Sequence, residues 1–143
     1  MPRFIWQAVS TVLEKSLPIG GPALLEKVRT LLRENSFDKV FLATEDAEIF
    51  RLFMESDIRD EILYVPQERI DYSREENTDK MLSDIYAQKE RDGYVETLKY
   101  IGILTLLSER DALVSTVNCG AFKFAVGLND HRYEFANVYT PNE

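Results

Sequence analysis

The stretch "DKVFLATEDAEIF", residues 38–50, decides the fold class. A charged start leads into a continuous apolar run that ends at residue 44, and helical spacing begins directly after it. An uninterrupted apolar run is typical of a strand buried on both faces, as in a parallel sheet. Parallel strands need a crossover connection, which is usually a helix. This stretch therefore predicts an α/β fold.

The rest of the chain repeats the same alternation. An apolar helical stripe precedes the run, and a polar loop is expected over residues 67–79. Further strands are expected over residues 61–66 and 111–117, and residues 132–139 are expected to form a fourth strand or an extended tail. Helices are expected over residues 79–90, 94–109 and 119–128. Alternating strands and helices imply right-handed crossovers. We therefore predict a Rossmann-like three-layer domain with a mostly parallel sheet of about four strands, flanked by helices.

The amino-terminal segment is predicted to be a separate amphipathic helix. Its apolar residues fall at helical spacing: Phe4, Ile5, Ala8, Val9, Val12 and Leu13. The Pro/Gly-rich segment at residues 17–23 then interrupts the pattern. We therefore expect a helix and linker over residues 1–20 and the Rossmann-like domain over residues 21–143. The alternative is a terminal arm that remains from a larger ancestor.

Composition limits the class of partner. The 143 residues carry a formal net charge of -8, which disfavours nucleic acid and anionic lipid as ligands. With one cysteine and one histidine, neither an internal disulfide nor a Cys/His metal cluster is expected. No apolar run reaches the length of a bilayer span, and no signal peptide is expected. We therefore expect a cytoplasmic protein with no metal and no membrane span.

Small polar residues mark one candidate site, where the third predicted strand gives way to a helix. Free backbone N–H groups at a helix start, together with the helix dipole, favour a phosphate. The residues expected to hold it are Thr116, Val117, Asn118, Cys119, Gly120 and Ala121. The alternative is that Asn118 is only an N-cap.

A second cluster follows the strand at residues 38–44. Ligands bind beyond the carboxyl ends of parallel strands where the strand order reverses, and we expect this strand to neighbour the third one. Thr44, Glu45 and Asp46 could then contact a ribose or a base; the alternative is a capped helix start with Thr44 as the cap. Cys119 has no base nearby in sequence, because His131 lies beyond the next helix, so catalytic residues remain unassigned.

Three motifs together resemble the carboxy-terminal half of fucosyltransferases of the NodZ and α1,6-fucosyltransferase group, which have the GT-B fold. They are "ATED" at residues 43–46, "LLSERD" at residues 106–111 and "STVNCG" at residues 115–120. The similar region covers residues 22–128. The resemblance implies a donor-binding half whose diphosphate lies on the turn at residues 116–121. Gln67 and Arg69 in the polar loop are further candidate contacts.

The resemblance implies a sugar nucleotide such as GDP-fucose as the ligand, with no cofactor. The family's amino-terminal half, which carries acceptor contacts and an Arg-rich motif, has no counterpart here, so no catalysis by this chain alone is expected. A second copy or a separate chain that supplies this half is then a candidate partner. The alternative function is a ligand-free α/β module for interaction or self-association, derived from such a domain.

Overall fold

The computed structural model describes residues 4–9, 21–74, 76, 87, 89, 91–115, 120–130 and 132–139. For residues 4–9 the description covers the backbone.

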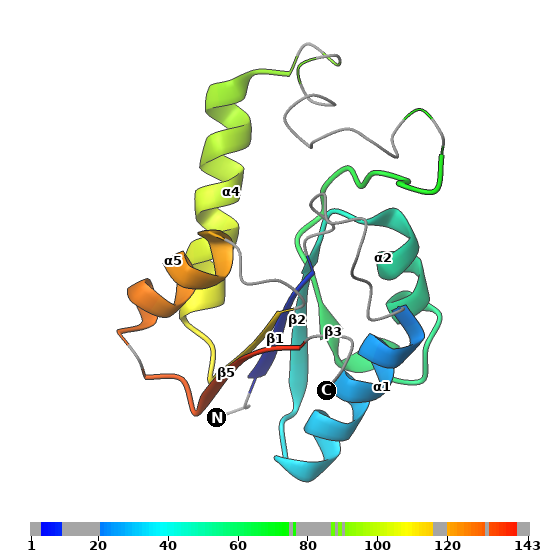
Figure 1. Ribbon diagram of the computed structural model, residues 1–143, viewed down its shortest axis with the longest axis vertical. Helices are drawn as coiled ribbons and strands as arrows, with labels where there is room; N and C mark the ends of the chain where they lie inside the picture. The colour runs from blue at the N-terminus through cyan, green and yellow to red at the C-terminus, as the bar shows by residue number, and fades with distance from the viewer. Residues whose placement is uncertain are drawn as a thin grey trace.

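The centre of the structure is a sheet in which every pair of neighbouring strands is parallel (Figure 1). The strand order is β3-β2-β1-β4-β5. The strands are β1 (Phe4–Val9), β2 (Lys39–Thr44), β3 (Ile62–Leu63), β4 (Ala112–Ser115) and β5 (Phe135–Val138). The predicted α/β class and parallel direction are confirmed, and the sheet has five strands where about four were expected.

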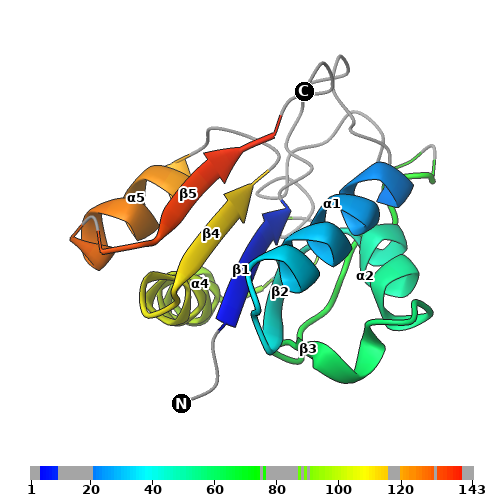
Figure 2. The same cartoon turned by 90° about the horizontal axis from the view of Figure 1, so that it is seen from below.

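Helices cover both faces of the sheet (Figure 2). One face carries α1 (Gly21–Glu34) and α2 (Ala47–Met54), and the other carries α4 (Gly93–Ser108) and α5 (Gly120–Asn129). The short 3-10 helix η1 (Arg59–Glu61) leads into β3. The three layers follow from the parallel connections, because each crossover helix packs back onto the sheet.

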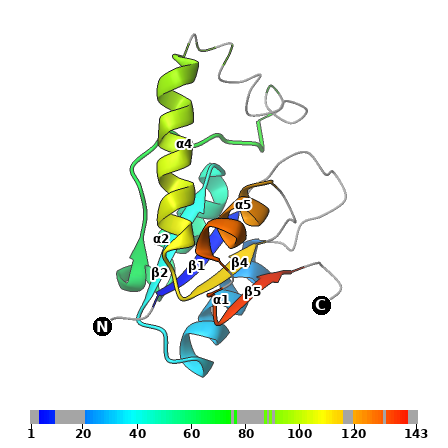
Figure 3. The same cartoon turned by 90° about the vertical axis from the view of Figure 1, so that its left-hand side faces the viewer.

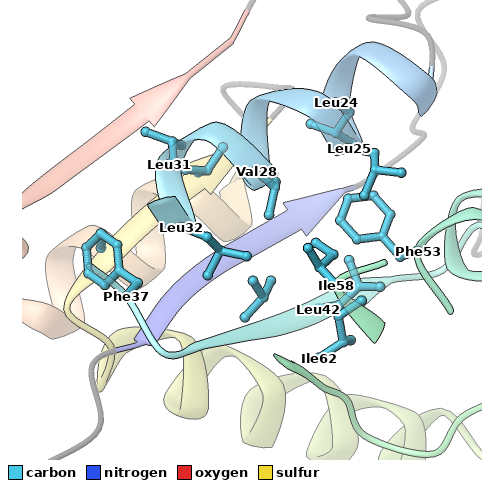
Figure 4. Close-up of a cluster of buried hydrophobic side chains, with 13 residues drawn as sticks. Leu24, Leu25, Val28, Leu31, Leu32, Phe37, Leu42, Phe53, Ile58 and Ile62 are labelled. Atoms are coloured by element: carbon cyan, nitrogen blue, oxygen red, sulfur yellow. The ribbon is translucent and has the colours of Figure 1, made fainter. Parts of the chain in front are cut away.

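Alternating side chains of β2 supply both halves of the core. Val40 and Leu42 pack in the cluster under α1 and α2, whereas Phe41 packs in the cluster under α4 and α5. Successive side chains of a strand point to opposite faces, so a strand covered on both sides must be apolar throughout. Figure 4 shows the α1 side of the core, where Val28 and Phe53 are fully buried.

The predicted amino-terminal helix is wrong for residues 4–9. These residues form β1, which pairs with both β2 and β4 and is the central strand of the sheet. The segment "FIWQAV" is rich in aromatic and β-branched residues, which favour strands, and six residues are too few to separate a helical period from a strand. The hydrogen-bonded pairing of residues 4–9 with β2 and β4 outweighs the helical spacing of their apolar residues. Residues 4–9 thus share one sheet with the rest of the chain.

The expected contact between β2 and β4 is also wrong, because β1 lies between them. In register, Gln7 of β1 lies opposite Leu42 on one side and Val114 on the other. Neighbouring strands lie about 4.8 Å apart, so the ends of β2 and β4 are separated by roughly 10 Å.

Helix α4 agrees with the helix expected over residues 94–109 and carries apolar side chains on all sides. Its carboxyl-terminal turns pack on the sheet through Leu104 and Leu107, while its amino-terminal turns extend away from it (Figure 3). The helix expected over residues 79–90 falls almost entirely outside the described residues. Within the described part of the chain, no helix has the length and apolar character to cross a membrane.

Candidate functional site

The carboxyl ends of the strands form the candidate site. Strands β2 and β3, which follow β1 in the chain, lie in order on one side of β1, and β4 and β5 lie in order on its other side. The strand order therefore reverses between β1 and β4. Figure 2 shows the arrowheads of β1, β4 and β5 pointing to the same edge. In open parallel sheets, ligands bind outside this edge at such a reversal, because the crossovers there diverge.

Thr44 and Asp46 build the start of α2 and are both buried at this edge. The Oγ1 atom of Thr44 accepts a hydrogen bond from the Asp46 N–H at 3.1 Å. The Oδ1 atom of Asp46 accepts from the N–H groups of Glu48 and Ile49 at 2.8 and 3.1 Å. The cap of α2 is therefore Asp46 and not Thr44. Thr44 Oγ1 and Asp46 Oδ1 thus accept hydrogen bonds from backbone N–H groups at the start of α2.

Glu45 lies between these two residues and differs from both. Its backbone carbonyl accepts from the Ile70 N–H at 2.7 Å, but its half-buried carboxyl has no hydrogen-bond or ion-pair partner among the described residues. Burial raises the pKa of this carboxyl to about 7, because the charged form loses water that no cation replaces. Near neutral pH the group can therefore both donate and accept a hydrogen bond.

The loop after β3 lies across the carboxyl end of β2. Gln67 donates from Nε2 to the Thr44 carbonyl at 3.1 Å. Ile70 forms a parallel bridge with Asp46, and its carbonyl accepts from the Ala47 N–H at 3.0 Å. The structure thus brings Gln67 to the same edge as residues 44–46.

Arg69 is packed into the protein on this loop. Its guanidinium lies 3.6 Å from the centre of the Phe50 ring and 5.6 Å from that of Tyr64. It donates to the carbonyls of Gln67 at 3.1 Å and Val65 at 3.3 Å. Burial lowers the pKa of Arg69 from its ordinary value, and the buried Nε atom has no hydrogen-bond partner. The two Arg69 nitrogens whose partners are described thus donate hydrogen bonds to carbonyl groups of the same loop.

Helix α5 begins on the other side of β1, directly after residues 116–119. Thr116, Val117, Asn118 and Cys119 lie outside the described residues, as does His131. Gly120 and Ala121 form the first turn of α5, and a Cβ atom added at Gly120 would meet nothing within 4 Å. The first amides of a helix have no partner within the helix, so the N–H groups of this turn are not used by α5 itself. Only the last two residues of the predicted phosphate turn, Gly120 and Ala121, can be placed.

The feature that the sequence did not predict is β1, the central strand of the sheet. The expected helix over residues 4–9 left the carboxyl end of β1 out of the predicted ligand-binding edge. The aromatic and β-branched residues of "FIWQAV" could have indicated a strand. Among the described residues, no three His, Cys, Asp or Glu side chains are placed to hold a metal ion.

Comparison of this chain with protein-family models, curated proteins and solved structures finds no match. The functional interpretation therefore depends on the geometry of the sheet edge and on the residue types found there.

Proposed function

We propose that this chain binds a sugar nucleotide of the GDP-fucose kind at the carboxyl edge of its sheet. In this proposal it is the Rossmann-like donor-binding half of a fucosyltransferase-like GT-B glycosyltransferase and does not catalyse transfer alone. The observation that carries the proposal is the reversal of strand order between β1 and β4, with polar groups on both sides of it.

The two sides of the reversal supply different chemistry. The start of α5 offers amides that have no partner within the helix and the positive end of a helix dipole, which suit a diphosphate. The Glu45 carboxyl, on the other side, suits a hydroxyl of a ribose or an N–H of a base. The ends of β2 and β4 are roughly 10 Å apart, which is a span that a nucleoside diphosphate can bridge.

Gly120 gives the proposal a sharp test. A Cβ atom at either Gly120 or Gly127 of α5 would meet nothing within 4 Å, so valine at either position leaves the packing of the free protein unchanged. Only Gly120 lies in the first turn, where a diphosphate must approach the backbone closely. We expect Gly120→Val to weaken GDP binding at least about 10-fold and Gly127→Val to leave it unchanged.

Isothermal titration calorimetry with GDP and with GDP-fucose measures this directly. Binding of the wild-type chain that is lost in Gly120→Val alone supports the proposal. An absence of heat and of thermal stabilisation at about 1 mM ligand contradicts the proposal, as does equal binding by both valine variants.

A further inference from the structure

Helix α4 exposes a band of apolar side chains, which we name the α4 stripe. It consists of Val95, Leu98, Gly102, Thr105 and Leu106, flanked by Tyr94 and Ile101. These positions recur every three or four residues, so they share one face of the helix, opposite to Leu104 and Leu107. The exposed fractions are 73% for Tyr94, 50% for Leu98, 46% for Ile101, 42% for Val95 and 38% for Leu106.

The amino-terminal turns of α4 have little packing of their own. Figure 3 shows them extending beyond the sheet and beyond α5. Helix α4 includes Gly102 and several β-branched residues, which lower intrinsic helix propensity, so packing is needed to stabilise it. Ion pairs from Glu96 to Arg91 and Lys99 lie near its start, and the α4 stripe itself carries no charge. A partner that covers the stripe would therefore be apolar there.

Two leucines of the α4 stripe, Leu98 and Leu106, are placed symmetrically about Gly102. Leu98 lies four residues before this glycine and Leu106 four residues after it. A Cβ atom at Gly102 would meet nothing within 4 Å, so the centre of the stripe is open for close approach of another helix. In a twofold antiparallel crossing at Gly102, Leu98 of each copy would lie against Leu106 of the other. This is the self-complementary arrangement that an isologous dimer requires.

The exposed area fits a weak dimer. The large apolar side chains on α4 expose on the order of 500 Å² in one copy, near the upper end of the largest apolar patch on a typical monomer. Two such surfaces would bury about 1,000 Å² in total, which is the lower limit for a specific interface.

We propose that two copies of this chain associate by packing α4 against α4 in antiparallel orientation, with Gly102 at the crossing. The inference is independent of nucleotide binding, since the α4 stripe lies on a helix and not at the sheet edge.

Sedimentation equilibrium with paired glycine variants tests the interface. Gly102→Glu places a charged side chain at the crossing, and Gly127→Glu makes the same change on α5, where a Cβ atom also meets nothing within 4 Å. We expect the wild-type chain and Gly127→Glu to form dimers at about 100 µM and Gly102→Glu to associate at least 10-fold more weakly. Circular dichroism of both variants checks that they fold.

Cysteine cross-linking tests whether Gly102 lies at the crossing point. In a Cys119→Ser background, which removes the native cysteine, Gly102→Cys should oxidise to a disulfide-linked dimer, because the crossing brings the two residues within about 7 Å. Gly127→Cys is the control and should stay monomeric. A wild-type chain that is monomeric at about 100 µM overturns the proposal, and so do two glutamate variants that associate equally. If α4 binds only a different protein, the wild-type chain would be monomeric in this experiment, and the proposal of self-association would be overturned.

Discussion

At the scale of single residues, three neighbours at the end of β2 fall into two different environments. Thr44 and Asp46 make local hydrogen bonds, as is typical of threonine and aspartate at the start of a helix. A helix start at this position could be predicted from the change of period in the sequence, but the expected cap was Thr44, whereas the structure shows Asp46 as the cap. The isolated environment of the Glu45 carboxyl could not be predicted from the sequence. It depends on the loop from Tyr64 to Ile70, which packs against this end of the strand.

Glu45 should make the stability of the protein depend on pH. Its pKa rises from 4.5 in the unfolded chain to about 7 in the folded protein, so the folded state binds the proton more tightly. Stability should therefore fall as pH rises from about 4.5 to 7, by at most about 3 kcal/mol, and then level off. Glu45→Gln cannot ionise and should lack this contribution.

Urea unfolding of the wild-type chain and Glu45→Gln at pH 5 and pH 8 measures the effect. The difference between the two proteins isolates Glu45 from the other carboxyl groups. We expect Glu45→Gln to be the more stable protein at pH 8 by about 1–3 kcal/mol, and this advantage should largely disappear at pH 5. A difference that is the same at both pH values would contradict the assigned environment of Glu45.

At the scale of elements, the loop from Tyr64 to Ile70 is held in place by Arg69. The guanidinium lies over Phe50 of α2 and donates to two carbonyls of the loop itself. A charged residue in a polar stretch is expected to be solvated, so the sequence did not predict this packing. The aromatic surface that makes it favourable comes from a different element.

Arg69→Lys should loosen this loop. Lysine keeps the charge but lacks the planar fork that stacks on an aromatic ring and donates two bonds at once. We expect a loss of about 1–2 kcal/mol in the free energy of unfolding. Arg51→Lys is the matched control, because Arg51 is exposed on α2 and the change should stay within about 0.5 kcal/mol.

Chemical denaturation compares the two lysine variants, and amide hydrogen exchange locates the change. Faster exchange at Ile70, whose N–H bonds to the Glu45 carbonyl, is the expected signature. If both lysine variants unfold at the same urea concentration as the wild-type chain, the stacked guanidinium does not stabilise the loop.

At the scale of the whole molecule, the fold class could be predicted from the sequence and the strand order could not. Buried strands such as residues 38–44 are recognisable because both faces must be apolar. Strand order depends on which edges pair across long separations, and local patterns carry no information about that choice. Placing β1 at the centre changed the candidate site from two adjacent strand ends to an edge three strands wide.

Removal of residues 1–9 should abolish folding. Strand β1 pairs with β2 over residues 4–9 and with β4 over residues 5–8, so its loss leaves both without their inner partner. We expect a chain of residues 10–143 to show no cooperative thermal transition by far-ultraviolet circular dichroism, whereas removal of residues 1–3 alone leaves the transition in place. Cooperative unfolding of the shorter chain would mean that the amino-terminal segment is dispensable.

The central place of β1 also has a consequence for folding during synthesis. The ribosome makes this strand before the other described strands of the sheet, and β2 can pair with it soon afterwards. The other edge of β1 has no neighbour until residues 112–115 leave the exit tunnel, roughly 5–20 s after β1 at usual rates of translation. During that interval the nascent chain presents an open strand edge to other chains, and a chaperone that shields it would raise the yield of native protein.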